Sequence, residues 1–116
     1  MVLVGNSIVE ADTITIKNRI QLKITPSLAS ILMNQKSDWL IIKKEMEKGR
    51  TLVDLLSAVA PSYAKFCKAV FNPDTKQFSD EVMVILNGNL VQRPSIMEIK
   101  LNDGDIVMLV LMFIGG

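Results

Sequence analysis

The sequence contains no histidine and a single cysteine, Cys67. The usual zinc and copper ligand sets are therefore missing, as are the Ser-His-Asp and Cys-His arrangements of nucleophilic catalysis. One cysteine also excludes an intrachain disulfide or a redox pair, and we expect Cys67 to be a buried structural thiol. We therefore predict no metal site, no bound cofactor and no catalytic residue of the chain's own.

Several other signals are missing. Neither the G-x-x-x-x-G-K-[ST] nor the G-x-G-x-x-G phosphate-binding pattern occurs. The net charge is +1 and the basic residues are scattered, so nucleic acid is not an expected partner. The longest apolar run, residues 106–114, is far shorter than the roughly 20 residues that span a membrane. Residues 1–8 do not form a secretory signal, and we expect a cytoplasmic protein without membrane contact.

The chain has 116 residues, of which 49% are hydrophobic. This length and composition suit one domain with a single packed core. We expect residues 1–12 to form a loosely ordered leader and residues 13–116 to form the domain. Residues 26–38 form an insert within it, and the diglycine Gly115-Gly116 forms a free tail.

Alternating apolar and polar side chains predict two strand segments at the start of the domain, Thr13–Lys17 and Ile20–Ile24. Asn18-Arg19 is expected to join them by a turn or bulge. After Pro26, the segment Ser27–Met33 is expected to form a short helical turn. Trp39–Met46 then suits a second strand, antiparallel to the first.

The main helix is predicted to begin at Thr51, whose hydroxyl can cap it, with Asp54 in the first turn. Its apolar stripe has the spacing of one helix face: Leu52, Leu55, Leu56 and Val59. Pro61 should end this helix. A second short helix is expected within Ser62–Phe71, with four residues on its inner side: Tyr63, Phe66, Cys67 and Val70.

The last third of the chain carries two sharp turn signals, Asn87-Gly88 and Asn102–Asp105. The first should join a strand at Glu81–Leu86 to Leu90-Val91. The second leads into Ile106–Ile114, which is apolar at every position, as in a strand covered on both faces or central in its sheet. We expect three basic residues to be solvated or to meet an acidic partner: Arg50, Arg93 and Lys100.

This order of elements predicts an α+β fold, a mixed sheet with one main helix packed on one face. Four motifs then stand in a specific order: Gly49–Leu56, Val84–Gly88, Leu101–Asp105 and Gly115-Gly116. Together they resemble the ubiquitin-like β-grasp sulfur carriers, such as the small subunit of molybdopterin synthase and the carrier of thiamine biosynthesis. The resemblance covers roughly residues 39–116. From the tail alone, a chance ending and a functional one are equally compatible, and the ordered motifs favour the functional one.

The resemblance implies a sulfur-carrier function rather than an enzyme. An E1-like enzyme would use ATP and Mg²⁺ to adenylate the Gly116 carboxylate, and a sulfur donor such as a persulfide enzyme would convert it to a thiocarboxylate. A synthase subunit would accept the sulfur, with molybdopterin slightly favoured over thiamine. Gly115 and Gly116 are thus the implied site, because glycines pass through a narrow channel.

Two residues next to this site have two possible roles. Phe113 and Ile114 can either contact a partner or complete the core. Two other functions also remain open. One is a ubiquitin-like modifier that forms isopeptide bonds through Gly116, and the other is a β-grasp binding module in which the tail has no role.

Overall fold

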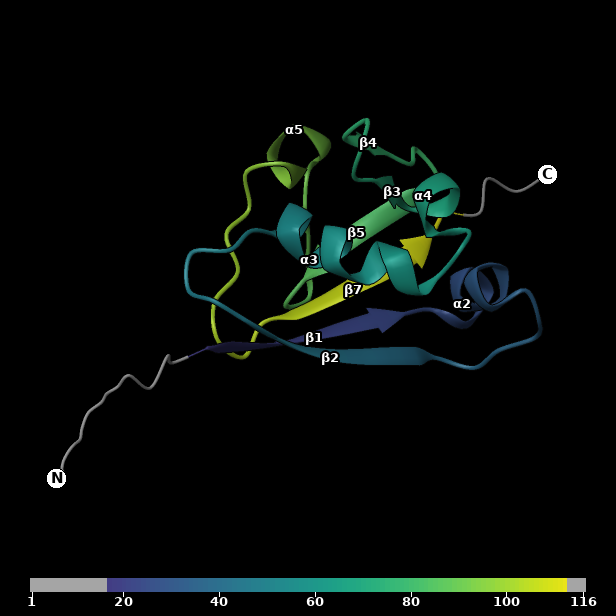
Figure 1. The fold of residues 1–116 in the computed structure, drawn as a ribbon, viewed down its shortest axis with the longest axis horizontal. Helices are drawn as coiled ribbons and strands as arrows, with labels where there is room; N and C mark the ends of the chain where they lie inside the picture. Colours follow the sequence, from purple (N-terminus) through teal and green to yellow (C-terminus); the bar gives the residue numbers. More distant parts are fainter. Residues whose placement is uncertain (1–16, 113–116) are drawn as a thin grey trace, which may run out of the picture.

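The computed structural model describes residues 17–112 of the chain (Figure 1). Its strands are β1 (Asn18–Ile24), β2 (Leu40–Met46), β3 (Phe71–Asn72), β4 (Gln77–Phe78), β5 (Val82–Leu86), β6 (Asn89–Leu90) and β7 (Ile106–Leu111). Its helices are α2 (Pro26–Met33), α3 (Leu52–Val59), the 3-10 helix η2 (Ala60–Ser62), α4 (Phe66–Ala69) and α5 (Arg93–Ile96). Within this range no helix is long and apolar enough to cross a membrane.

The described residues form a five-stranded sheet in the order β2-β1-β7-β5-β6, with a separate β3-β4 pair. Strands β1 and β7 run parallel, whereas β1-β2, β5-β7 and β5-β6 are antiparallel, so the sheet is mixed as predicted. The turn expected at Asn18-Arg19 is wrong. Asn18 pairs with Met46 and Arg19 with Glu45, because the ladder with β2 continues through both residues.

Helix α3 crosses one face of the sheet (Figure 1) and begins with the predicted cap. The Thr51 hydroxyl accepts a hydrogen bond of 3.2 Å from the Asp54 N–H, and the Asp54 carboxylate accepts one of 2.9 Å from the Thr51 N–H. This reciprocal capping box satisfies two N–H groups that a helix start leaves free. The predicted apolar stripe of α3 is buried in the core: Leu52, Leu55, Leu56 and Val59.

Strand β7 is central in the sheet, as its apolar sequence predicts. Val107 and Leu109 point toward the helices and are fully buried. Of the two alternatives for this strand, the central position is therefore the one confirmed, and the described helices lie over one face of the sheet. Ile106 on the opposite face is exposed, and Met108 and Val110 beside it are only partly covered.

Segment 26–38 contains helix α2, confirming the helical turn predicted after Pro26. The second predicted helix is shorter than expected, since α4 spans only Phe66–Ala69. Phe66 and Val70 are buried, but Cys67 is exposed, so the predicted buried thiol is wrong. In a helix each residue turns about 100° from the one before it, so a helix that buries Phe66 directs Cys67 elsewhere.

Both predicted sharp turns are present, and a side-chain network joins them. Asn87 and Gly88 have φ values of 50° and 85°, and Gly104 has 86°. Positive φ is the conformation that Asn-Gly and Asp-Gly turns supply. The Asn87 side chain donates to the Asp105 carboxylate at 2.9 Å and accepts from the Ile106 N–H at 2.8 Å. The network therefore fixes the start of β7.

Candidate functional site

The predicted site residues are Phe113, Ile114, Gly115 and Gly116, and they lie outside the described residues. The structure instead describes the base of this tail, which is the end of β7 and the segments packed around it. Leu111 is the last residue of β7, and Met112 follows it. Met112 is therefore the last described residue before the predicted site.

A hydrogen bond to a neighbouring segment holds the base of the tail. The Met112 N–H donates to the Glu81 carbonyl at 2.6 Å. This bond continues the antiparallel ladder by one step beyond the pair Val82–Leu111. Met112 is partly buried, and it lies four positions before Gly116. The turn that carries Glu81 thus contributes to the direction of the backbone at the start of the tail.

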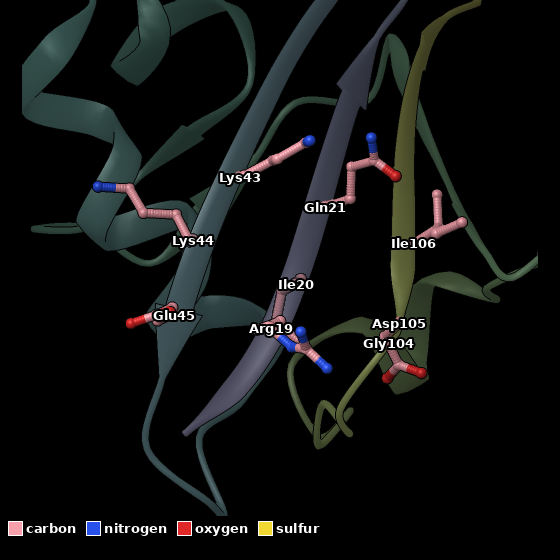
Figure 2. A pocket seen from close by; sticks show the side chains of 9 residues that line it. All are labelled: Arg19, Ile20, Gln21, Lys43, Lys44, Glu45, Gly104, Asp105 and Ile106. Carbon is pink, nitrogen blue, oxygen red and sulfur yellow. The ribbon is translucent and has the colours of Figure 1, made fainter. Parts of the chain in front are cut away.

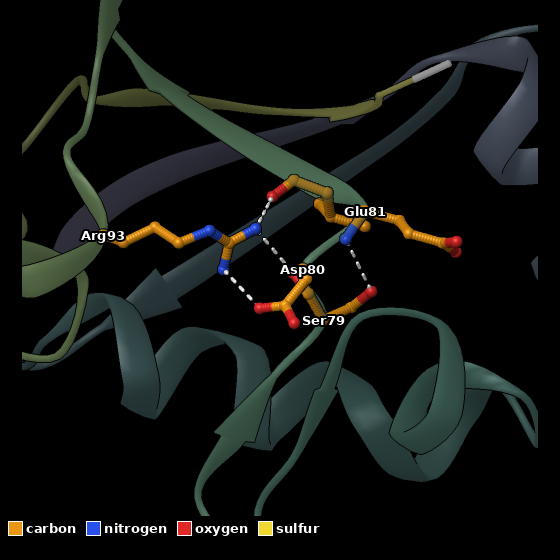
Figure 3. Close-up of polar contacts among 5 residues, drawn as sticks. Ser79, Asp80, Glu81 and Arg93 are labelled. Atoms are coloured by element: carbon orange, nitrogen blue, oxygen red, sulfur yellow. Dashed lines mark hydrogen bonds and ion pairs between the residues drawn. The ribbon is translucent and has the colours of Figure 1, made fainter. Parts of the chain in front are cut away.

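Arg93 binds that turn from the other side (Figure 3). Its Nη2 donates to the carbonyls of Ser79 at 2.8 Å and of Val82 at 3.0 Å. Its Nη1 lies 3.8 Å from the Asp80 carboxylate. The guanidinium carbon also lies 5.7 Å from the centre of the Phe78 ring, within the range of a cation–π contact. One side chain therefore contacts three residues that precede β5 and Val82, the first residue of that strand.

Arg93 was expected to be solvated or to meet an acidic partner, and it is exposed, but it also makes contacts within the molecule that the sequence did not indicate. The side chain is 41% exposed, yet its Nη2 donates to two carbonyls within the molecule. The Ser79 and Val82 carbonyls lie 14 and 11 positions before it, which no local pattern connects. A positive residue one place before Pro94 gave no signal of this role.

A groove opens beside the end of β7. It lies between α2 and α4, has a volume of about 630 Å³, and is lined by residues that include Leu28, Ile31, Cys67, Lys68 and Leu111. A hydrogen bond of 3.0 Å from the Lys65 ammonium to the Asn34 side chain connects the segments that form its walls. The exposed thiol of Cys67 is thus close to the base of the tail.

The open face of the sheet, opposite α3, is apolar along β5, β6 and β7. Strand register and burial place six apolar side chains on it: Met83, Ile85, Leu90, Ile106, Met108 and Val110. Toward β2 the same face becomes polar, with Arg19, Gln21 and Lys43 lining an open groove of about 640 Å³ (Figure 2). Leu90 and Ile106 are exposed and the other four are partly buried. Contiguous exposed apolar side chains can mark a protein contact surface.

Two titratable groups at the ends of the sheet have shifted pKa values. The Arg19 backbone N–H donates to the Asp103 carboxylate at 2.7 Å, and this bond holds the pKa of Asp103 below its ordinary value. The Glu47 carboxylate accepts a hydrogen bond of 2.9 Å from Arg50 and raises the pKa of that guanidinium. Both pairs are on the surface, where ion pairs contribute little to stability.

Residues 17–112 contain no group of three His, Cys, Asp or Glu side chains placed to hold a metal ion. What they form is a core strand that leads to the tail, an anchored residue at its end, and an apolar sheet face. Such an arrangement is suited to contact with another protein.

Comparisons with known proteins agree with this description. The sequence profile of the ThiS family matches residues 38–116. Curated protein sequences give no match. Among solved structures, the HVO 2177 protein of Haloferax volcanii is similar with a TM-score of 0.65 and 21% identity, over 86% of this chain and 88% of that one.

Two further structures are similar. SAMP1 from Haloferax volcanii has a TM-score of 0.64 and 18% identity, over 85% of this chain and 100% of its own. Urm1 from Trypanosoma brucei has a TM-score of 0.63 and 16% identity, over 86% of this chain and 97% of its own. These TM-scores show a shared fold, and at identities this low the similarity shows the fold alone. The predicted ubiquitin-like β-grasp fold is thereby confirmed.

Proposed function

This chain belongs to the ThiS family of small ubiquitin-like carriers, which work with E1-like activating enzymes and are not themselves enzymes, and we propose that it carries sulfur as a thiocarboxylate on Gly116. The observation that supports this most is that the family match extends over residues 38–116, including both glycines. In the same region, β7 leads from the centre of the sheet to the anchored residue Met112.

The proposed activation takes place on the partner. The Gly116 carboxylate oxygen attacks the α-phosphate of ATP, pyrophosphate leaves, and an acyl-adenylate forms. Mg²⁺ on the partner would offset the phosphate charges. Because oxide is a poor leaving group and AMP a good one, adenylation makes the acyl carbon open to attack. The proposal places these steps in the cytoplasm, where ATP is supplied.

Sulfur transfer then takes two steps. A persulfide sulfur on the donor enzyme attacks the acyl carbon and displaces AMP, which leaves an acyl disulfide. A thiol attacks the donor's sulfur in that disulfide, so the donor leaves as a mixed disulfide and Gly116 keeps the second sulfur as a thiocarboxylate. That sulfur is anionic at neutral pH and nucleophilic, and it passes to the acceptor held by a synthase subunit.

The contribution of this chain is to present the tail. Gly115 and Gly116 carry no side chain, so they can enter a narrow channel in backbone conformations that other residues disfavour. Phe113 and Ile114 are proposed partner contacts. We place molybdopterin slightly ahead of thiamine as the destination, following the sequence resemblance.

Reconstitution with the host's E1-like enzyme tests the proposal. The full chain should support ATP–pyrophosphate exchange, whereas a variant lacking Gly115 and Gly116 should not, with an unchanged circular dichroism spectrum. If the truncated protein were activated as well as the full chain, the tail would have no role. Supplying the thiocarboxylated protein to the large subunit of molybdopterin synthase or to thiazole synthase then distinguishes the pathways.

A second candidate is a protein modifier that forms an isopeptide bond through Gly116. The observation in its favour is that the solved structures with this fold include small archaeal modifier protein 1 from Haloferax volcanii and from Methanosarcina acetivorans. It shares the activation step with the carrier. A Gly-Gly remnant on lysines of host proteins, detected after proteolysis, would identify it.

A further inference from the structure

Arg93 holds a segment of backbone that it reaches from outside the sheet (Figure 3). It is the first residue of α5, and its Nη2 donates to two carbonyls, those of Ser79 and Val82. Hydrogen bonds from a charged donor are roughly twice as strong as neutral ones. A lysine at this position would offer a point charge on a flexible stem in place of a planar guanidinium with several fixed donors.

The segment held by Arg93 is closed by its own hydrogen bonds. The Glu81 N–H donates to the Ser79 hydroxyl at 3.2 Å, and the Val82 N–H donates to the Ser79 carbonyl at 3.4 Å. The Ser79 N–H in turn donates to the Val70 carbonyl at 2.8 Å, next to the core. Arg93 therefore contacts a turn that is closed by hydrogen bonds. A displacement of the Ser79 or Val82 carbonyl should also displace the Glu81 carbonyl, which lies between them in the chain.

That carbonyl is the acceptor of the Met112 N–H, so the contacts of Arg93 extend to the base of the tail in two steps. Extended chain covers at most about 3.6 Å per residue, so Gly116 lies within about 14 Å of Met112. A change in the direction of the backbone at Met112 changes the direction from which the tail starts. Displacements of about 1 Å at a reacting centre can lower a rate about 100-fold.

We propose that Arg93 is a positioning residue for activation of the tail: through the turn Ser79–Val82 and the Glu81 carbonyl, it sets the direction in which the backbone leaves β7. This inference rests on the proposed function, because it concerns delivery of Gly116 to the activating enzyme. The ion pair with Asp80 is a minor part of it. The Asp80 side chain is 98% exposed, and exposed ion pairs contribute little.

Three variants separate positioning from other roles. Arg93→Met keeps the aliphatic stem and loses all donors, while Arg93→Lys keeps the charge and loses the guanidinium. Arg50→Met is the matched control, because Arg50 is also a partly exposed arginine but bonds Glu47, three positions away. ATP–pyrophosphate exchange with the host's E1-like enzyme is measured over a range of carrier concentrations, well below the melting temperature of each variant.

We expect Arg93→Met to lower kcat by about 10- to 100-fold with KM little changed, because docking remains while the carboxylate is misplaced. Arg93→Lys should resemble Arg93→Met, and Arg50→Met should keep the wild-type kcat. An increase in KM that lysine reverses would instead make Arg93 a docking charge and overturn the inference. An unchanged kcat in Arg93→Met would overturn it as well.

A second measurement does not depend on the activating enzyme. Amide hydrogen exchange, followed by NMR, should be about tenfold faster or more at Met112 in Arg93→Met, since hydrogen bonds to charged groups stabilise by at least that factor. Amides in the centre of β1 should keep their wild-type rates. An unchanged rate of amide hydrogen exchange at Met112 would refute the positioning role of Arg93. A wild-type protein that supports no ATP–pyrophosphate exchange would instead refute the proposed function, so the two failures can be told apart.

Discussion

The side-chain amide of Asn87 donates a hydrogen bond of 2.9 Å to the Asp105 carboxylate, joining two turns that are 18 residues apart. The other carboxylate oxygen of Asp105 accepts from the Asn102 N–H at 2.7 Å. Asp105 is only 8% exposed. A buried carboxylate with two donors therefore fixes the entry to β7, the strand that leads to the tail.

Replacing Asp105 by alanine should lower the free energy of unfolding by about 2–3 kcal/mol, because both donors lose their acceptor in a partly buried place. Urea unfolding followed by circular dichroism measures the change. Asp74→Ala is the control, since Asp74 is an exposed carboxylate away from this network, and it should change stability by less than about 0.5 kcal/mol. Equal effects of the two substitutions would contradict a structural role for Asp105.

The capping box at α3 predicts a second stability effect. Thr51→Ala removes the acceptor of the Asp54 N–H and should cost about 1 kcal/mol. Thr51→Ser keeps the hydroxyl and should cost much less. Thermal and urea unfolding measure both variants, and a loss in the serine variant as large as in the alanine variant would show that the cap is not the cause.

Asp103 predicts a dependence of stability on pH. Its pKa is lowered from 3.8 in the folded state, chiefly by the hydrogen bond from the Arg19 N–H. A lowered folded-state pKa means that the carboxylate stabilises the fold above pH 3.8 and that this contribution is lost as the pH falls through the folded-state value. Wild type should therefore be more stable than Asp103→Asn near neutral pH.

The comparison of wild type and Asp103→Asn by urea unfolding at a series of pH values tests this sign. Their difference should be constant above about pH 5 and should shrink below pH 3.8. The effect should be small, because Asp103 is solvent-exposed. A difference that grew as the pH fell would mean that the folded-state pKa is raised.

The exposed thiol of Cys67 gives a prediction for the groove between α2 and α4. In the native protein it should react with a water-soluble disulfide reagent at a rate of the same order as a free thiol, without urea. Cys67→Ser should keep the stability and the pyrophosphate exchange of the wild type, since the proposed chemistry takes place at Gly116. Reaction only after unfolding would indicate a buried thiol.

Much of the fold could be predicted because local patterns determine it. The stripe of α3 and the Thr51 cap depend on residues close together in the chain, and both are present as predicted. The last strand, predicted as Ile106–Ile114, is central in the sheet but ends at Leu111, and residues 113 and 114 lie outside the described part of the chain. The Asn87-Gly88 turn follows from backbone preferences of those two residues. These elements in this order were sufficient to predict a mixed sheet with a helix on one face.

The errors and omissions arise from contacts between distant residues. Asn18-Arg19 has the composition of a turn, yet pairing with β2 keeps it extended. Cys67 faces solvent because the position of α4 depends on burial of Phe66. Arg93 is the clearest case. Its acceptors are backbone carbonyls. Every residue has a backbone carbonyl, so the sequence does not indicate which of them accept a hydrogen bond from a distant side chain.

The central claim is that Gly116 carries sulfur, and intact mass spectrometry of the protein purified from its native host tests it most directly. We predict a fraction whose mass is greater by the difference between a sulfur and an oxygen atom, with fragmentation placing the change at Gly116. Arg50→Met should keep this fraction, and deletion of Gly115-Gly116 should abolish it. Protein that always carries an unmodified carboxylate, in cells where its sulfur-requiring pathway is active, would contradict the account.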